Sequence, residues 1–276
     1  MKLKQIHNLP LDKFINLSLY DDKFGYYMKK NPFGSKGDFI TAPNISRLFS
    51  EVVAIWILSF WQSLGCPKKF NLVELGAGNG EMMKVLIECS KNFPVFFKSC
   101  NFIIKEKSPL LKKIQRKTLV KTKTIWVSNI SKIKNIPSIF IANEFFDAIP
   151  IKQFFKKENN WFQKFVSIKP QNKATYINKK FNMNKLEKKL NFKISKNQNF
   201  IEYPEQGFDY LKNISKIIKK NDGGMLLIDY GYTQKRMKNT LQAISKHKFV
   251  NILDNIGNVD ITHNLSFELF KNFVKK

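Results

Sequence analysis

Short apolar segments of strand length alternate with amphipathic helical segments over much of this chain. Residues 70–75 form an apolar run of strand length, and residues 81–90 place their apolar side chains on one side of a helix. Strands that alternate with helices predict a parallel sheet that is covered on both faces. The expected fold class is therefore α/β, with a mainly parallel, doubly wound, Rossmann-like sheet. Its further strands are predicted at 102–105, 125–127, 139–142 and 225–229.

Changes in this rhythm divide the chain into four predicted segments. The first is helical, the second is the α/β core, and the third opens with a hairpin and is interpreted as a β-rich insertion. The fourth is expected to supply the rest of the core, with a short C-terminal end. Their boundaries are 1–64, 65–150, 151–200 and 201–276.

The charge of the chain is strongly positive, with 48 Lys and Arg against 21 Asp and Glu and a formal net charge of +27. Only Arg47, Arg116 and Arg236 are arginines, whereas proteins that grip phosphate usually use the planar guanidinium. We interpret most of the lysine excess as solvated surface, and nucleic-acid binding stays open as the alternative.

The cysteine content and the hydropathy of the chain indicate where in the cell the protein is located. Three widely spaced cysteines are too few for a disulfide framework and indicate a reducing environment. The longest apolar run, 52–61, is too short to insert into a membrane, and the N-terminus resembles neither a signal nor a transit peptide. These features predict a cytosolic protein. They leave the oligomeric state undetermined.

A glycine-rich turn follows the first core strand and is the most informative motif. Glycines at such a crest let a ligand lie against backbone N–H groups. A dinucleotide site would need its third glycine at Glu81, and an acid before the turn would repel a diphosphate. Glu74 suits a cationic amino-acid group, and Glu106, at the end of the next strand, suits ribose hydroxyls. These requirements predict S-adenosyl-L-methionine, and the alternative is a purely structural turn. The predicted cofactor residues are Glu74, Gly76, Ala77, Gly78, Gly80, Glu106 and Asn143.

The run Asn143–Pro150 follows the fourth core strand and carries two carboxylates, Glu144 and Asp147. Spaced by three, they would point the same way if the turn were helical. Paired carboxylates can grip a guanidinium and leave one of its nitrogens electron-rich and aligned for methyl transfer. We therefore predict Glu144 and Asp147 as catalytic residues acting on arginine. The alternative is that Glu144 caps backbone amides and Asp147 caps a helix.

Two further acidic groups lie at strand ends. Asp229 and Tyr230 end the fifth strand and are candidates for the substrate side. Glu202 and Glu205 precede a predicted helix at 206–219, and we interpret them as carboxylates at a helix N-terminus. The three histidines show no metal-ligand spacing, so no metal site is predicted.

Several runs together resemble the MidA-type S-adenosylmethionine-dependent methyltransferases. The runs are Gly37–Pro43 with Ile45-Ser46, Glu74–Gly80, Asn143–Pro150, Asp229–Gly231 and Asp260–Thr262, together with Glu106, Ser108-Pro109, Glu202 and Pro204-Glu205. The resemblance implies a class I methyltransferase fold and methylation of arginine in a protein substrate, such as a respiratory complex I subunit. It also implies an N-terminal lid over the site. The lid or substrate-side residues would be Asp38, Thr41, Pro43 and Ser46.

The chain departs from this family pattern at Asn44, where the family usually has an acidic residue. Two alternatives to protein arginine methylation remain. One is an RNA methyltransferase, suggested by the charge of +27, and the other is an assembly factor that binds the cofactor without transferring its methyl group.

Overall fold

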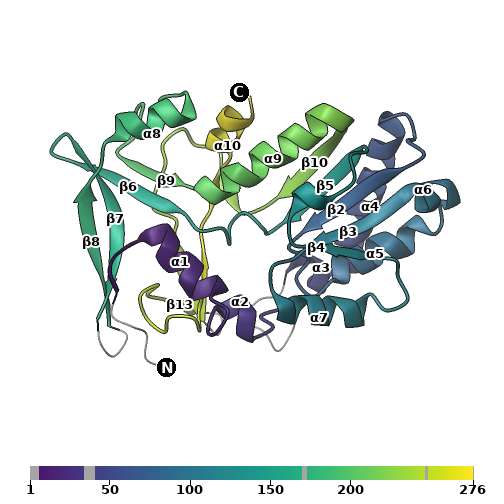
Figure 1. Ribbon diagram of the computed structural model, residues 1–276, viewed down its shortest axis with the longest axis horizontal. Helices are drawn as coiled ribbons and strands as arrows, with labels where there is room; N and C mark the ends of the chain where they lie inside the picture. Colours follow the sequence, from purple (N-terminus) through teal and green to yellow (C-terminus); the bar gives the residue numbers. More distant parts are fainter. Residues whose placement is uncertain (1–5, 34–40, 170–172, 246–247, 276) are drawn as a thin grey trace. The chain divides into compact units, whose positions relative to one another are not determined.

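The computed structural model describes residues 6–33, 41–169, 173–245 and 248–275 (Figure 1). Its contacts divide the chain into two compact units. We call Tyr27–Phe145 with Leu211–Asp229 the parallel-sheet unit. The antiparallel unit comprises the chain up to Tyr26, Phe146–Tyr210 and the chain from Tyr230 onward.

A five-stranded parallel sheet forms the centre of the parallel-sheet unit, as the alternating pattern predicts. Because its strands are parallel, the carboxyl ends of neighbouring strands meet at one edge. Glu74, Glu106 and Asn143 therefore belong to the same edge of the sheet. The order of the strands is β10 (Gly223–Ile228), β5 (Ser138–Asn143), β2 (Phe70–Leu75), β3 (Cys100–Lys105) and β4 (Ile125–Val127).

Alternate side chains of the sheet build an apolar core with three helices. Leu72 pairs with Phe102 on one side and Ile139 on the other, and all three are buried. Residues of the opposite parity, such as Val73 and Phe140, are buried as well, so both faces of the sheet are covered. The helices that share this core are α4 (Arg47–Ser63), α5 (Glu81–Ser90) and α6 (Pro94–Ser99).

The remaining helices of this unit follow local capping rules. Helix α7 (Pro109–Thr118) begins with Pro at its first position, and the Ser108 hydroxyl accepts a hydrogen bond from the Leu111 N–H at 3.2 Å. Ser108 is therefore the N-cap of this helix. The shorter elements are α3 (Ala42–Ile45) and the 3-10 helix Ile130–Lys132, and α2 spans Tyr26–Lys29.

The Gly223-Gly224 pair belongs to β10, so this strand begins two residues before the predicted start at residue 225. Both glycines lie at the start of β10, paired with Ser138 and Ile139 of β5. A Cβ at Gly223 would approach the Ser138 carbonyl oxygen to 2.0 Å, and one at Gly224 would approach the ring of Phe60 to 2.5 Å. The glycines are needed because β10 packs closely against β5 and α4.

The antiparallel unit contains the predicted hairpin, formed by β6 (Lys152–Lys157) and β7 (Asn160–Ile168). β7 also pairs with β1 (Ile6–Pro10) and β8 (Ala174–Lys180), and β6 pairs with β9 (Phe200–Tyr203). Two small sheets complete the unit, β13 (Lys248–Val250)–β12 (Gln242–Ser245)–β14 (Asp260–Thr262) and β11 (Gly231–Tyr232)–β15 (Leu265–Ser266). Its helices are α1 (Leu11–Tyr20), α8 (Met183–Leu190) and α10 (Phe267–Val274), while α9 spans Glu205–Asn221.

These units do not coincide with the four predicted segments. The first segment is divided at Tyr26, and the chain from Tyr230 groups with the inserted region and not with the parallel sheet. The reason is the strand pairing: of the strands described after residue 200, β10 alone joins the parallel sheet. β9 pairs with β6 of the insertion, and the others pair with one another. Within the described ranges, no helix is long and apolar enough to cross a membrane.

Candidate functional site

The glycine-rich turn after β2 has a backbone that L-residues rarely adopt. Gly76, Gly78 and Gly80 have φ angles of 65°, 52° and 89°, all in the left-handed region. A Cβ at Gly76 would approach the Phe145 ring to 2.7 Å, and one at Gly78 would lie 3.5 Å from the Phe33 ring. The left-handed backbone therefore favours glycine at all three positions, and at Gly76 the Phe145 ring also leaves no room for a Cβ, whereas the distance at Gly78 is ordinary van der Waals contact. Ala77, between them, is buried.

Gln115 ties the glycine turn to Glu106, a connection that our sequence reasoning missed. Its side-chain nitrogen Nε2 donates to the Gly78 carbonyl oxygen at 2.9 Å and to Oε2 of Glu106 at 3.0 Å. Its oxygen Oε1 accepts a hydrogen bond from the Trp126 indole N–H at 3.0 Å. The side chain is fully buried, and both of its N–H donors and one acceptor position of its oxygen are used, so it fixes both sides of the predicted cofactor site.

Glu106 is a buried carboxylate at the end of β3. Its Oε1 accepts the backbone N–H groups of Lys107 and Ser108, each at 2.8 Å, while Oε2 faces Gln115. Burial raises the pKa of this carboxyl group, and the hydrogen bonds from Ser108 and Gln115 oppose the rise. The carboxylate is thus held in one orientation before any ligand binds.

Two buried acceptor atoms at the same sheet edge have no hydrogen-bond donor among the described residues. Glu74 is only 3% exposed, and its Oε2 has no hydrogen-bond partner among the described residues. The same holds, within the described ranges, for Oδ1 of Asn143. Burial, and secondarily the charge of Glu106, raises the pKa of Glu74 to about 8.

These open atoms fit the predicted cofactor. A buried acceptor without a donor is costly, so such atoms commonly mark the place of a ligand. The ammonium group of S-adenosyl-L-methionine has donors for Glu74 and Asn143, and its ribose has donors for Glu106. The donor and acceptor set at this edge therefore suits an uncharged ribose with a cationic amino-acid end better than it suits a diphosphate.

The segment 41–46, which precedes α4, lies beside both the glycine turn and Glu144. The Asn79 side-chain nitrogen donates to Oδ1 of Asn44 at 2.8 Å, and the Asn44 nitrogen donates to the Thr41 hydroxyl at 2.8 Å. The backbone N–H of Ala42 hydrogen bonds to the Glu144 carboxylate. Thr41 and Pro43 are thereby placed next to the predicted site, and Ser46 ends this segment. Asp38, the other predicted lid residue, lies outside the described residues.

Glu144 lies in a tight turn and not in a helix, which corrects the geometry assumed for the acid pair. Its φ of 47° is left-handed, and the next turn closes with an Ile149 N–H to Phe146 carbonyl hydrogen bond of 3.1 Å. Burial raises the pKa of Glu144, while hydrogen bonds from Ala42 and Asn143 oppose the rise.

The two predicted catalytic carboxylates belong to different units. Glu144 is part of the parallel-sheet unit, where its backbone N–H donates to the Ile228 carbonyl oxygen at 2.9 Å. Asp147 is buried in the antiparallel unit, where its carbonyl oxygen accepts the His263 N–H at 3.0 Å. Each unit therefore holds one of the two acids by its backbone.

The other predicted acidic residues have different surroundings. Asp229 is half-buried, whereas the Tyr230 side chain is 61% exposed. Glu202 is buried and accepts hydrogen bonds from Gln153 and from the backbone N–H groups of Thr240 and Leu241. Its role is to fix the 239–241 loop, which corrects our interpretation of Glu202 as a helix N-terminal charge. Glu205 does lie in the first turn of α9, where it pairs with Lys152 and Lys189.

Comparison with known proteins identifies the family. A family model described as "Putative S-adenosyl-L-methionine-dependent methyltransferase" matches residues 52–276. The chain is 28% identical to the Xenopus laevis protein named protein arginine methyltransferase NDUFAF7, mitochondrial, over 99% of this chain and 68% of the relative. Identity to the human protein of that name is 26%, over 99% of this chain and 67% of the relative.

A solved structure supports the fold. A COG1565 superfamily member from Burkholderia thailandensis, crystallised with S-adenosyl-homocysteine, aligns with a TM-score of 0.78 at 20% sequence identity. The alignment covers 97% of this chain and 72% of that one. The likeness confirms the class I methyltransferase fold that the resemblance implied.

The relatives overturn the predicted location. The frog, human and Drosophila melanogaster relatives are all named as mitochondrial, so the prediction of a cytosolic protein is wrong. It rested on the cysteine content, the short apolar run and the N-terminal residues. The cysteine content indicates a reducing environment but does not say which compartment provides it.

The family model covers most of the chain, and the relatives of the chain are named as methyltransferases. These matches therefore establish both the cofactor, S-adenosyl-L-methionine, and methyl transfer as the activity. The chain belongs to the family of S-adenosyl-L-methionine-dependent methyltransferases.

Proposed function

We propose that this enzyme methylates arginine side chains of a protein substrate. The single observation that carries the proposal is the Glu144 carboxylate, which is partly buried at the end of β5 and anchored by the Ala42 N–H and the Asn143 side chain. The names of the frog and human relatives, which are protein arginine methyltransferases, support the same acceptor.

The cofactor would be held by the glycine turn, with Glu74 and Asn143 receiving its ammonium group and Glu106 a ribose hydroxyl. When bound, S-adenosyl-L-methionine supplies an electrophilic methyl group. Thr41 and Pro43, next to the Ala42 N–H that holds Glu144, would contact the substrate side, as would Asp229 and Tyr230.

Glu144 and Asp147 would act on the acceptor. A guanidinium has its positive charge spread over three nitrogens, so each nitrogen is a poor nucleophile. Carboxylates that accept hydrogen bonds from two of the nitrogens draw the charge toward themselves and leave the third electron-rich. Because burial raises the pKa of Glu144, this group is also suited to take the proton that the methylated nitrogen releases.

The test is methyl transfer with radiolabelled cofactor to a lysate of cells that lack the enzyme, followed by amino-acid analysis of the labelled protein. We expect label in methylarginine, and a decrease of about 10²- to 10⁴-fold for Glu144→Gln. Glu158→Gln, which changes an exposed hairpin carboxylate in the same way, serves as the control. Label in RNA, or no transfer at saturating cofactor, would overturn the proposal in favour of an RNA methyltransferase or an assembly factor without transfer activity.

A further inference from the structure

The turn that carries Asp147 accepts hydrogen bonds from two distant parts of the chain. We call residues 146–149 the Asp147 turn. The Asp147 carbonyl oxygen accepts the His263 backbone N–H at 3.0 Å, and the Ala148 carbonyl oxygen accepts the Tyr20 hydroxyl at 3.2 Å. Tyr20 is the last residue of α1 and His263 directly follows β14, and all of these residues belong to the antiparallel unit. Two consecutive carbonyl groups of the turn are therefore held by opposite ends of the chain.

The His263 imidazole is buried beside the same turn in a way that does not favour stability. It is 3% exposed, and its Nε2 has no hydrogen-bond partner among the described residues. Its Nδ1 lies 3.4 Å from the Asn264 carbonyl oxygen, which is long for a hydrogen bond. Burial lowers the pKa of His263, while the charge of Glu202 and the nearby backbone of Ile149 and Phe146 oppose this fall. Because a buried polar atom without a partner destabilises a fold, stability alone does not explain an imidazole at this position.

The segment that carries His263 is fixed in turn by Glu202. The Thr240 hydroxyl accepts the Asn264 backbone N–H at 2.9 Å and donates to the Glu202 carboxylate. Gln153 of β6, the strand that follows the Asp147 turn, pairs with Glu202 and donates to its Oε1 at 2.8 Å. One hydrogen-bond network therefore orders both the His263 segment and the strand that leaves the turn.

We propose that Tyr20 and His263 are positioning residues for Asp147. The inference rests on the proposed role of Asp147 in binding the acceptor guanidinium. A carboxylate that grips a guanidinium must be held in one place, because a displacement of about 1 Å can slow a reaction by about 10²-fold. Both residues act through the backbone of the Asp147 turn and not on the acceptor itself.

The first test compares methyl transfer by full-length variants with their unfolding temperatures. Tyr20→Phe removes one hydroxyl and keeps the ring, and His263→Phe replaces the imidazole by an apolar ring. At saturating cofactor, each should lower the rate at which methylarginine forms in a lysate of cells that lack the enzyme by about tenfold. The dissociation constant of S-adenosyl-homocysteine should not change, since the predicted cofactor residues belong to the parallel-sheet unit. His263→Phe should also keep or raise the unfolding temperature, because it removes the buried unpaired nitrogen.

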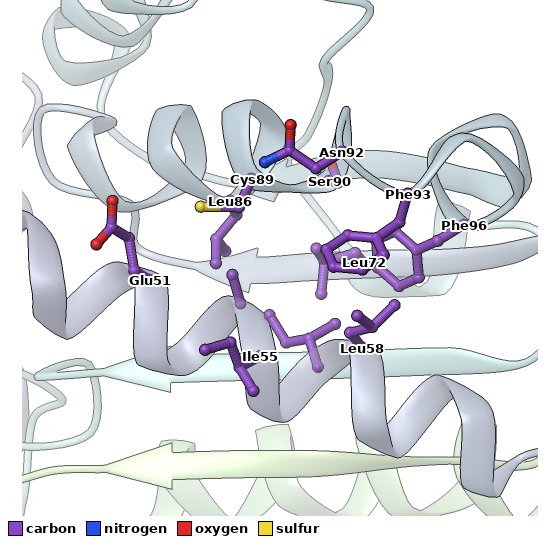
Figure 2. A pocket seen from close by; sticks show the side chains of 12 residues that line it. Glu51, Ile55, Leu58, Leu72, Leu86, Cys89, Ser90, Asn92, Phe93 and Phe96 are labelled. Carbon is purple, nitrogen blue, oxygen red and sulfur yellow. The ribbon is translucent and has the colours of Figure 1, made fainter.

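Leu58→Ala is the control for a loss of stability alone. Leu58 lines an apolar cavity of about 310 Å³ on α4, in the parallel-sheet unit, and Figure 2 shows it among the other lining side chains. The substitution removes apolar contacts and should lower the unfolding temperature, while the rate stays within about twofold of the wild type. A similar loss of rate in Leu58→Ala and in Tyr20→Phe would overturn the proposal.

A double-mutant cycle with Asp147→Asn separates positioning from a general disturbance of the structure. If Tyr20 acts through Asp147, Tyr20→Phe should lower the rate much less in the Asp147→Asn background than in the wild type. An equal loss in both backgrounds, or no loss in the wild type, would overturn the proposal.

Amide hydrogen exchange tests the hold on the turn without an acceptor. The Ile149 N–H donates to the Phe146 carbonyl oxygen at 3.1 Å, and Tyr20→Phe should speed its exchange by about fivefold or more. Tyr176→Phe, which removes the hydroxyl of a 42% exposed tyrosine in the same unit, should leave this exchange unchanged. Equal exchange in Tyr20→Phe and the wild type would overturn the proposal. A wild type that forms no methylarginine, together with the expected difference in exchange, would instead overturn the proposed acceptor and keep Tyr20 as a residue that holds the turn.

Discussion

The Gln115 side-chain nitrogen lies 3.0 Å from Oε2 of Glu106, and it lies 2.9 Å from the Gly78 carbonyl oxygen. One buried amide thus joins the turn after β2 to the acid after β3. A glutamine and a glutamate are each uninformative alone, but this hydrogen-bonded pair orders both sides of the predicted cofactor site.

Replacing Gln115 should weaken cofactor binding without any direct contact being removed. Gln115→Ala loses a hydrogen bond to a charged group and one to the glycine turn, so we expect the dissociation constant to rise by about ten- to a hundredfold. Calorimetric titration with S-adenosyl-homocysteine measures it.

Gln115→Glu gives this prediction a second readout. It would set two carboxylates against each other, which raises their pKa values, and binding should recover partly as the pH is lowered toward about 5.5 and one of them accepts a proton. Affinity that is unchanged, or that is lost equally at all pH values, would mean that Gln115 acts only in packing.

Glu74 should make the stability of the ligand-free protein depend on pH. Its pKa is raised from 4.5 to about 8, so the fold favours the protonated form. The favourable contribution is complete below pH 4.5 and is lost as the pH rises toward 8, at up to about 1.4 kcal/mol per pH unit. Glu74→Gln should remove this loss, and urea unfolding of both proteins from pH 5 to pH 9 measures the difference. Parallel curves for the two proteins would contradict the prediction.

Gly78 should be needed for cofactor binding as well as for stability. A Cβ at its φ of 52° costs about 1–2 kcal/mol, and more for a β-branched residue, so both Gly78→Ala and Gly78→Val should lower the free energy of unfolding. Both should also weaken binding, because the added carbon lies over the turn, 3.5 Å from Phe33. Gly65→Ala is the matched control, since Gly65 has a φ of 79° and no described atom lies within 4 Å of its Cβ position. Equal binding losses at both glycines would refute the assignment of the turn.

Asn44 should tolerate an acid but not an apolar residue. Its Oδ1 accepts the Asn79 amide, and a carboxylate at this position keeps that acceptor. Asn44→Asp should therefore retain cofactor affinity within about threefold, whereas Asn44→Leu should lose the link and weaken binding by about tenfold. Thermal shifts with S-adenosyl-homocysteine rank the three proteins. A leucine variant that binds as well as the wild type would show that the link is dispensable.

The strands and helices of the parallel-sheet unit could be predicted because short stretches of sequence specify each of them. The predicted strand 70–75 and the predicted helix 81–90 agree with β2 and α5 at both ends. The insertion beyond the hairpin could not be assigned, since β8 is a lysine-rich strand that is specified by its pairing with β7.

The burial of Gln115 could have been predicted from its position on the apolar face of α7. It lies four residues after Leu111 and four before Leu119, and all three side chains are buried. A polar residue on the apolar face of a helix was therefore a readable signal of a buried hydrogen-bond network. The left-handed backbone of Glu144 had no such signal, because it depends on the hydrogen bonds that Asn143, Ala42 and Ile228 make around it.

The hydrogen bonds that orient Glu106 also limit what it can still receive. A carboxylate has about four lone-pair positions. The two on Oε1 are occupied by backbone N–H groups, and Gln115 occupies one on Oε2. A single position remains, so this acid can accept one hydroxyl of an adenosine sugar and not both. Of the 2′-deoxy and 3′-deoxy cofactor analogues, only one should therefore bind Glu106 as the natural nucleoside does.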